Sequence, residues 1–218
     1  MVVPVKPRKI AVLFSGGVDS TATAIYFLKQ GYETRLITFD NGAEKWLELA
    51  EYKADWIKKQ FPERCSWELL ESTHLFHELA IRPLEQDVKK YGNLICCGCK
   101  LAMLCEAIIY CKRNGITQLA DGFQREQDYY PEQTPDYMVP ADRFARAYCI
   151  RCLHPFWEHP GLTQDQITLS GSVPTSPMQP YCIFGCNPIL NKKFIRPYVQ
   201  SKLPAMRKYV DAALSRKK

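Results

Sequence analysis

A run of hydroxyl, glycine and carboxylate residues separates a strand-like segment from a helix-like segment near the start of the chain. Residues 9–14 (KIAVLF) are typical of a short buried strand, and residues 18–31 (VDSTATAIYFLKQG) are typical of a helix that ends at Gly31. The turn between them reads SGGVDS, residues 15–20. Successive backbone N–H groups and the positive end of a helix dipole attract an anion. The sequence therefore predicts a phosphate-binding turn at the end of the first strand.

The residue types within this turn suit a polyphosphate. Gly16 and Gly17 allow close approach of the backbone and positive φ, and Ser15 and Ser20 add hydroxyl donors. Asp19 offers a carboxylate ligand for Mg²⁺ if the anion is a polyphosphate. The turn matches neither the G-x-x-x-x-G-K-[ST] loop nor the G-x-G-x-x-G fingerprint. Transfer of a γ-phosphate and binding of a dinucleotide are therefore disfavoured.

Strand-like and helix-like segments alternate along the rest of the chain. Further strands are expected at 33–40, 65–72, 116–122 and 151–158, and helices over 43–61, up to about residue 91, over 100–114 and after Pro197. Such alternation predicts an α/β fold with a doubly wound parallel sheet. Ligands bind beyond the carboxyl ends of the strands in such sheets. The turn, Asp40, Gly122 and a polar loop at 123–140 are expected to meet at that edge.

The chain length allows one α/β domain with a small appendage, because 218 residues can bury a sizeable core. We expect a domain over residues 1–190, with an irregular Cys- and Pro-rich lid at about 123–190, and a basic helix over 191–218. Nine of the 29 Lys and Arg residues lie between 192 and 218. This basic end suits a phosphate-rich partner, with a solvated helix end as an equal alternative.

The location of the protein decides how its ten cysteines are interpreted. Neither a signal peptide nor an apolar stretch long enough for a membrane span is evident, so we expect a cytoplasmic protein without a membrane partner. In a reducing compartment, cysteines favour metal or redox chemistry over disulfides. Cys65, Cys105 and Cys111 are expected to be small buried apolar residues.

The segment FSGGVDST resembles the pyrophosphate loop of the PP-loop ATP pyrophosphatases. This resemblance implies an adenine nucleotide α-hydrolase-like, Rossmann-like fold that binds ATP and Mg²⁺. Such enzymes cleave ATP between its α and β phosphates and adenylate a carbonyl or carboxyl oxygen. It implies that Asp19 and Ser20 act in catalysis. The nucleotide-binding residues implied are Ser15, Gly16, Gly17, Val18, Asp19 and Ser20 at the phosphates, Phe39 and Asp40 at the adenosine, and Gly122 after the fourth strand.

The segment NLICCGCK is similar to the C-x-x-C-K segment of 4-thiouridine synthetases and to the C-x-x-C of iron–sulfur-dependent tRNA thiolases. Thiolates at Cys96 and Cys99 are favoured by a following helix N-terminus and by Lys100. The resemblance implies that both cysteines act in catalysis and bind a 4Fe–4S cluster with Cys182. One extra residue before Cys186 leaves the choice between Cys182 and Cys186 open. It also implies a sulfur donor, and a tRNA held by the basic C-terminal end or by a partner subunit.

A second pairing of the cysteines remains open. Cys149 and Cys152, together with Cys182 and Cys186, have acceptable spacing for structural Zn²⁺. The cluster on Cys96 and Cys99 is the favoured interpretation, and the zinc site is the alternative.

Three functions follow from these patterns. The leading hypothesis is ATP-dependent sulfur transfer, above all tRNA thiolation, for which a homodimer is one compatible assembly. The second is a 7-cyano-7-deazaguanine synthase-like enzyme, because FDNGA and QDYYPEQ are similar to segments of that family. The chain lacks the four closely spaced zinc cysteines of that family near its C-terminus. The third is a non-catalytic subunit that binds an adenine nucleotide.

Overall fold

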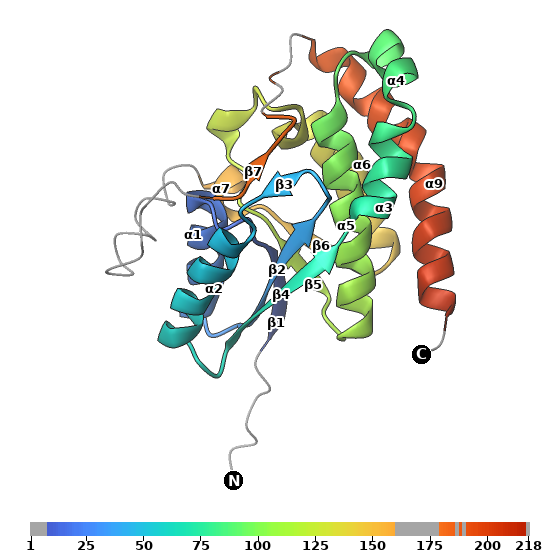
Figure 1. Cartoon of the computed structure of the whole chain (residues 1–218). Coiled ribbons are helices and arrows are strands. Elements are labelled where there is room, and N and C mark those ends of the chain that lie inside the picture. Colours follow the sequence, from blue (N-terminus) through green and yellow to red (C-terminus); the bar gives the residue numbers. More distant parts are fainter. Residues whose placement is uncertain (1–7, 160–178, 186–187, 189–190, 217–218) are drawn as a thin grey trace.

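A parallel sheet forms the centre of the computed structural model, which describes residues 8–159, 179–185, 188 and 191–216 (Figure 1). The five strands have the order β4-β2-β1-β5-β6, and each neighbouring pair is parallel. Their bounds are β1 Lys9–Leu13, β2 Glu33–Asp40, β4 Cys65–Glu71, β5 Gln118–Ala120 and β6 Arg151–Leu153. The chain winds outward in both directions from β1. The predicted doubly wound α/β fold is confirmed, and its topological switch point lies between β1 and β5.

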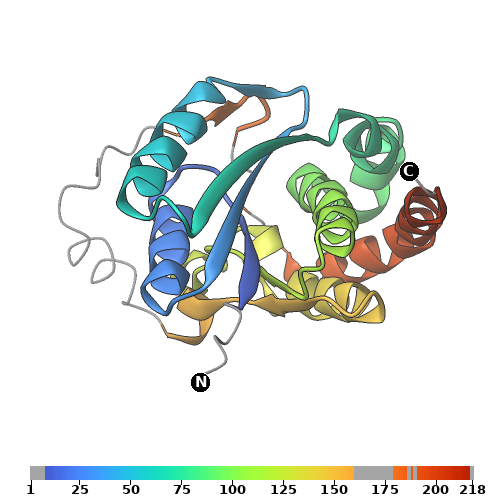
Figure 2. The same ribbon diagram turned by 90° about the horizontal axis from the view of Figure 1, so that it is seen from below.

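Helices α1 (Val18–Lys29) and α2 (Glu48–Gln60) cover one face of the sheet (Figure 2). Their apolar residues pack with Val12 and Leu36 from the strands, and Ala54 and Ile57 of α2 are fully buried. The short helix α7 (Pro155–Glu158) joins this layer, because Phe156 packs edge-on against Tyr26 of α1.

The other face is covered by a larger helical layer centred on α5 (Figure 2). The helices are α3 Thr73–Phe76, the π-helical turn η1 His77–Ile81, α4 Leu84–Tyr91, α5 Ile95–Arg113, α6 Pro135–Ala147 and α9 Ile195–Ser215. Helix α5 is apolar on nearly every side, as expected of a helix enclosed by neighbours. Cys105 and Cys111 are buried in it, and Cys65 is buried in β4, as predicted.

The structure corrects several predicted boundaries. Helix α5 begins at Ile95, five residues before the predicted start at Lys100, so the C-x-x-C motif lies inside its first turns. The helix predicted over 43–61 begins only at Glu48, as α2. The start of the predicted range instead forms β3 (Glu44–Lys45), which pairs antiparallel with β7 (Tyr181–Cys182). The predicted fifth strand ends at Leu153, where α7 follows.

The polar loop predicted over 123–140 is shorter and partly helical. It contains the 3-10 turns η2 (Arg125–Gln127) and η3 (Pro131–Gln133), and α6 begins at Pro135. Proline suits the first turn of a helix because its missing N–H is not needed there. The loop therefore ends earlier than its composition suggests.

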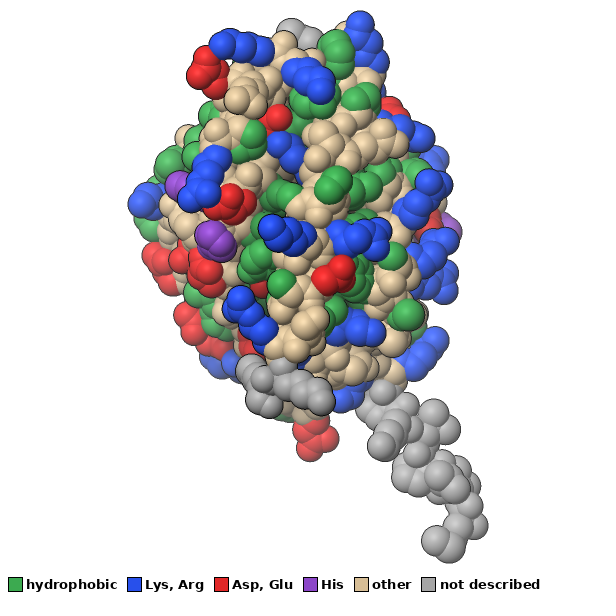
Figure 3. All heavy atoms as spheres, turned by 90° about the vertical axis from the view of Figure 1, so that its right-hand side faces the viewer, with side chains coloured by type: hydrophobic (Ala, Val, Ile, Leu, Met, Phe, Trp, Pro, Cys, Tyr) green, Lys and Arg blue, Asp and Glu red, His purple; other side chains and the backbone are tan. Residues whose placement is uncertain are grey.

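The basic C-terminal end is partly tied to the body of the protein. Lys202 of α9 forms a nearly buried ion pair with Asp87 of α4, and Arg196 pairs with Asp136 of α6 at 3.1 Å. Lys192 of the 3-10 turn η4 (Lys192–Phe194) pairs with Asp128. Figure 3 shows Lys and Arg side chains spread over the face that carries α9, with fewer acidic side chains between them.

No single helix in the described part of the chain is long and apolar enough to cross a membrane. Helices α4 and α5 reach the required length and composition only when taken together, and they meet at a bend of 120°.

Candidate functional site

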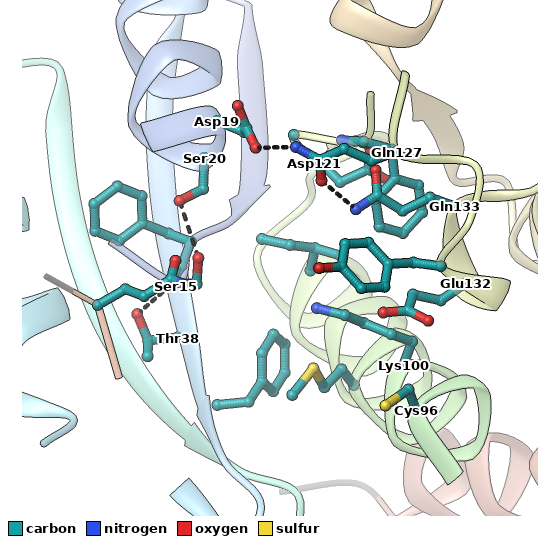
Figure 4. Close-up of a pocket in the computed structure, with 18 of the residues that line it drawn as sticks. Ser15, Asp19, Ser20, Thr38, Cys96, Lys100, Asp121, Gln127, Glu132 and Gln133 are labelled. Carbon is teal, nitrogen blue, oxygen red and sulfur yellow. Dashed lines mark hydrogen bonds between the residues drawn. The ribbon is translucent and has the colours of Figure 1, made fainter. Parts of the chain in front are cut away.

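A cavity of about 420 Å³ opens at the carboxyl ends of β1, β2 and β5, beside the topological switch point (Figure 4). Several residues singled out in the sequence share it. The predicted site residues that line it are Ser15, Asp19, Ser20, Phe39, Gly122 and Cys96. Lys100, Glu44, Glu132 and three aromatic residues of the 123–130 loop also line it, and the sequence did not assign them to the site.

The two glycines of the first turn are needed for different reasons. Gly16 has φ +72°, and a β-carbon there would come within 2.9 Å of the Ala50 backbone. Gly17 has φ −69° and an extended ψ, so the prediction of positive φ holds for Gly16 alone. A β-carbon on Gly17 would instead overlap the Gln179 side chain at 2.2 Å. Gly17 therefore provides room at the cavity wall.

The two serine hydroxyls of the turn lie next to each other. Ser20 Oγ donates to the Gly17 carbonyl at 3.1 Å, and Ser15 Oγ lies 3.3 Å from Ser20 Oγ. The Gly17 N–H donates to Ser15 Oγ at 3.3 Å. Val18 begins α1, packs beside Phe156 and is not among the described residues that line the cavity. An oxygen atom of an anion in the cavity can accept a hydrogen bond from Ser15 Oγ, and from Ser20 Oγ when that hydroxyl turns away from the Gly17 carbonyl.

Asp19 is held by glutamines from the loop after β5. Gln124 Nε2 donates to one carboxylate oxygen at 2.6 Å, and Gln127 Nε2 donates to the other at 3.3 Å. Gln133 fixes both, because its Oε1 accepts from the Gln124 N–H and its Nε2 donates to Gln127. Sequence reasoning missed this network, although three glutamines within ten residues of the expected lid are a usable signal. A half-buried carboxylate on the same turn as two hydroxyls fits Mg²⁺ that is bound mainly through phosphate oxygens.

Gly122 places the β5 turn directly against the phosphate-binding turn. A β-carbon on Gly122 would come within 2.7 Å of the Asp19 carbonyl carbon and 2.8 Å of the Ser20 nitrogen. Thr23 Oγ1 bridges the two elements by donating to the carbonyls of Asp19 and Asp121. Only a residue without a side chain fits this approach.

A buried Asp–His–Asp group supports the same turn from behind. His154 Nδ1 lies 2.9 Å from both carboxylate oxygens of Asp121, and its Nε2 lies 3.2 Å from Asp142. Burial lowers the pKa of His154, but the two carboxylates raise it more, to about 10. His154 is therefore protonated at neutral pH, both ring N–H groups donate, and Asp121 is held in place.

The wall opposite the turn carries charged side chains. Figure 4 shows Lys100 pointing into the cavity from α5, with Glu132 beside it. Burial raises the pKa of Glu132, against the lowering effect of its own backbone N–H and of Lys100. Burial also raises the pKa of Glu44, with Lys100 acting in the opposite direction.

Only one of the two residues predicted at the adenosine lines the cavity. Phe39 lines the cavity, whereas Asp40 is not among the described residues that line it. The Asp40 carboxylate accepts a hydrogen bond from the Gly42 N–H at 2.8 Å and so stabilises the turn after β2.

The structure brings part of the cysteine set together. Cys96 lines the cavity, and Cys99 accepts a hydrogen bond from Asn41 Nδ2 at 3.2 Å. Cys182, on β7, interacts electrostatically with Cys99. Burial raises the pKa of Cys99 to about 12, which outweighs the lowering by Lys100. The expectation of a stabilised thiolate at Cys99 is therefore wrong for the protein without a bound metal.

The described residues contain no group of three or more His, Cys, Asp or Glu side chains placed to hold a metal ion. Cys186 lies outside the described residues. The cluster on Cys96, Cys99 and Cys182 or Cys186 therefore stays a prediction.

The three described cysteines of the alternative zinc set lie in different surroundings. Cys149 is exposed, and Cys152 is half-buried beside Asp142 and Cys111. Cys182 instead lies near Glu44 and Lys100. The zinc site also stays a prediction.

Comparison with known proteins agrees with this architecture. The model of the family described as "Queuosine biosynthesis protein QueC" matches residues 9–156. No curated protein matches the chain in sequence.

Solved structures with the same fold include three proteins of low sequence identity. A 4-thiouridine synthetase, solved with RNA and bound ATP, has a TM-score of 0.63 at 19% identity, covering 96% of this chain and 54% of that one. A predicted subunit of tRNA methyltransferase from Methanocaldococcus jannaschii has a TM-score of 0.53 at 22% identity, covering 74% and 75%. The U34-tRNA thiolase NcsA from Methanococcus maripaludis, solved with its [4Fe-4S] cluster, has a TM-score of 0.51 at 14% identity, covering 97% and 73%.

Proposed function

This chain belongs to the QueC family, and from that premise we propose that it uses ATP to activate an oxygen atom of a heterocyclic acceptor. It is an ATP pyrophosphatase-type enzyme of the PP-loop superfamily. The observation that carries the proposal is that two sets of residues face the same cavity. The phosphate-binding turn forms one wall, and Lys100, Glu132 and Cys96 lie on the other.

The first step forms an adenylate. The acceptor oxygen attacks the α-phosphorus of ATP, and the bond to the β-phosphate oxygen breaks to release pyrophosphate. The hydroxyls of Ser15 and Ser20 and the N-terminus of α1 stabilise the negative charge of the departing group. Asp19 would hold Mg²⁺ together with the phosphates, and the ion would neutralise part of that charge. The Phe39 side chain supplies an apolar wall for the nucleotide.

The second step replaces the activated oxygen. A nucleophile attacks the carbon that bears the adenylate, AMP leaves with the oxygen, and the nucleophile loses a proton. Positioning of the two reactants in one cavity does most of the work, so little acid–base machinery is required. This agrees with a chain that has four histidines, of which His154 is already held by Asp121 and Asp142.

The acceptor best supported is a 7-deazaguanine carboxylate, with ammonia as the nucleophile. Adenylation of the carboxylate and attack by ammonia give an amide. A second adenylation, of the amide oxygen, and loss of AMP and a proton give a nitrile. The family match supports this acceptor, and so does the placement of QDYYPEQ (residues 127–133) along the cavity, where Gln127, Glu132 and Gln133 line the wall.

A pyrophosphate-release assay tests the proposal. We expect release from ATP that depends on 7-carboxy-7-deazaguanine and ammonia, with AMP as the second product. Asp19→Asn is expected to reduce this release at least about 100-fold, because it removes the carboxylate that would hold Mg²⁺ at the phosphates. Asp55→Asn, on the exposed side of α2, is the matched control. Full activity of Asp19→Asn would contradict the nucleotide site.

A second candidate, sulfur transfer to a tRNA base, is favoured by Cys96, which lines the cavity, and by the electrostatic interaction between Cys99 and Cys182. It requires a 4Fe–4S cluster on these cysteines and a tRNA held by the basic end or by a partner subunit. Anaerobic purification followed by iron, zinc and sulfide analysis separates the candidates. About four iron and four sulfide per chain, lost in Cys99→Ser, would favour thiolation. Protein without iron that still forms the nitrile would favour the first candidate.

A further inference from the structure

Three ionisable side chains line the cavity opposite the phosphate-binding turn and form no ion pair with one another in the described part of the chain. Lys100 from α5, Glu132 from η3 and Glu44 from β3 all face this space. Lys100 acts electrostatically on both carboxylates. None of the ion pairs among the described residues joins any two of the three. Opposite charges that face one cavity at a distance leave room for a ligand that contacts both.

Glu132 has an unsatisfied oxygen in this position. Its Oε2 atom is buried and has no hydrogen-bond partner among the described residues. A buried acceptor without a donor costs about 1–3 kcal/mol. Such groups are rare in folded proteins, and each calls for an explanation.

Glu132 is not needed to hold its own loop. The neighbouring Gln133 side chain makes the bonds that tie η3 to the rest of the loop, to the Gln124 N–H at 2.7 Å and to Gln127 at 2.9 Å. Thr134 caps the same turn by donating to the Pro131 carbonyl. The Glu132 carboxylate is therefore available for another molecule.

The remaining lining of this part of the cavity suits a flat ring. Phe123, Tyr129, Tyr130 and Met103 provide aromatic and apolar walls. A planar heterocycle packed there would place its polar edges within the plane of the ring. N–H donors on one edge of the ring would meet the Glu132 carboxylate. A negatively charged oxygen on another edge would meet the Lys100 ammonium group.

We infer that Glu132 is the specificity-determining residue of the acceptor site and accepts a hydrogen bond from a ring N–H of the heterocycle, while Lys100 faces the oxygen that is activated. This inference rests on the proposed function for the identity of the acceptor. Beyond the acceptor's identity, it assigns Glu132 to a ring N–H of the ligand and fixes the orientation of the ring in the cavity. The ring lies with its N–H edge towards η3 and its reactive oxygen towards the phosphate-binding turn.

Equilibrium binding of two probes tests the inference without turnover. The probes are 7-deazaguanine and its 1-methyl derivative, which lacks the N–H of the six-membered ring, each titrated in the presence of a non-hydrolysable ATP analogue. The wild-type chain is expected to prefer 7-deazaguanine by at least about tenfold, since a hydrogen bond to a buried charged group is worth that factor. Glu132→Leu is expected to bring the two dissociation constants within about threefold of each other. Glu126→Gln, an exposed position on the same loop, should keep the full preference.

Two further measurements keep the result unambiguous. The dissociation constant of the ATP analogue should be unchanged in every variant, which shows that the fold and the nucleotide site are intact. Glu132→Gln, which keeps the side-chain volume and an acceptor oxygen but removes the charge, should keep a preference between those of the wild-type chain and Glu132→Leu. Equal binding of both probes by the wild-type chain, binding of neither, or an unchanged preference in Glu132→Leu would overturn the inference. Absence of pyrophosphate release with a normal Glu132-dependent preference would overturn only the proposed reaction.

Discussion

Gly122, at the end of β5, lies against the first turn of α1, so that a β-carbon on it would come within 2.7 Å of the Asp19 carbonyl carbon. The two residues are far apart in sequence. Asp19 follows β1 and Gly122 follows β5, the two strands that flank the switch point. Their contact holds the phosphate-binding turn and the start of the glutamine-rich loop in one rigid unit.

Gly122→Ala should therefore disturb the nucleotide site. The added methyl group would push the β5 turn away from Asp19, at a cost of about 1–3 kcal/mol in the free energy of unfolding. We expect at least a tenfold loss of affinity for an ATP analogue, measured by calorimetry. Gly115→Ala is the control, because a side chain there adds backbone strain at φ +64° but meets no atoms within 4 Å. Equal affinities in the two variants would contradict the role of Gly122.

The buried Asp121–His154–Asp142 group predicts a pH-dependent stability. The pKa of His154 is raised to about 10 in the folded protein from an ordinary value near 6.5. Its stabilising contribution is therefore complete below pH ~6.5 and is lost as the pH rises through about 10. We expect wild-type stability, relative to His154→Gln, to fall across this range by about 3 kcal/mol in urea unfolding. A difference between the two proteins that does not change with pH would refute the prediction.

The ion pair between Lys202 and Asp87 should anchor α9 to α4. Both side chains are nearly buried, with exposed fractions of 9% and 13%. Lys202→Met would leave the carboxylate buried without a partner and should lower the free energy of unfolding by about 3–5 kcal/mol. Lys208→Met, at an exposed position of the same helix, should change it by less than about 0.5 kcal/mol. Chemical denaturation of the two variants measures the difference.

Thiol accessibility gives a separate test of the cysteine sites. Cys149 is exposed, whereas burial raises the pKa of Cys111 to about 12 and that of Cys105 well above its ordinary value. Since the thiolate is the reactive form, iodoacetamide at pH 8 should modify Cys149 long before the other two. Peptide mass spectrometry reports the order. Protection of Cys149 that disappears on addition of a zinc chelator would instead support the alternative zinc set.

Much of the fold could be predicted because its signals are local. The apolar run before SGGVDS and the alternating segments after it identified the strands, and the parallel sheet follows from their alternation with helices. Boundaries were less accurate where tertiary contacts decide them. The first two turns of α5 contain Cys96 and Cys99 because Leu101 and its neighbours are enclosed by the surrounding helices, which no local pattern shows.

The residue types of the phosphate-binding turn were likewise evident from the sequence alone, since the serines, glycines and Asp19 lie close together in the chain, whereas the φ of Gly17 was not. The opposite wall was decided only by the tertiary structure. Lys100 and Glu132 belong to different elements and meet at the cavity because the strand order places α5 and the loop after β5 over the same end of the sheet. Burial raises the pKa of Cys99 and of Cys111, whereas Asp121 and Asp142 overcome the effect of burial on His154. Both effects depend on all the elements packed around the group.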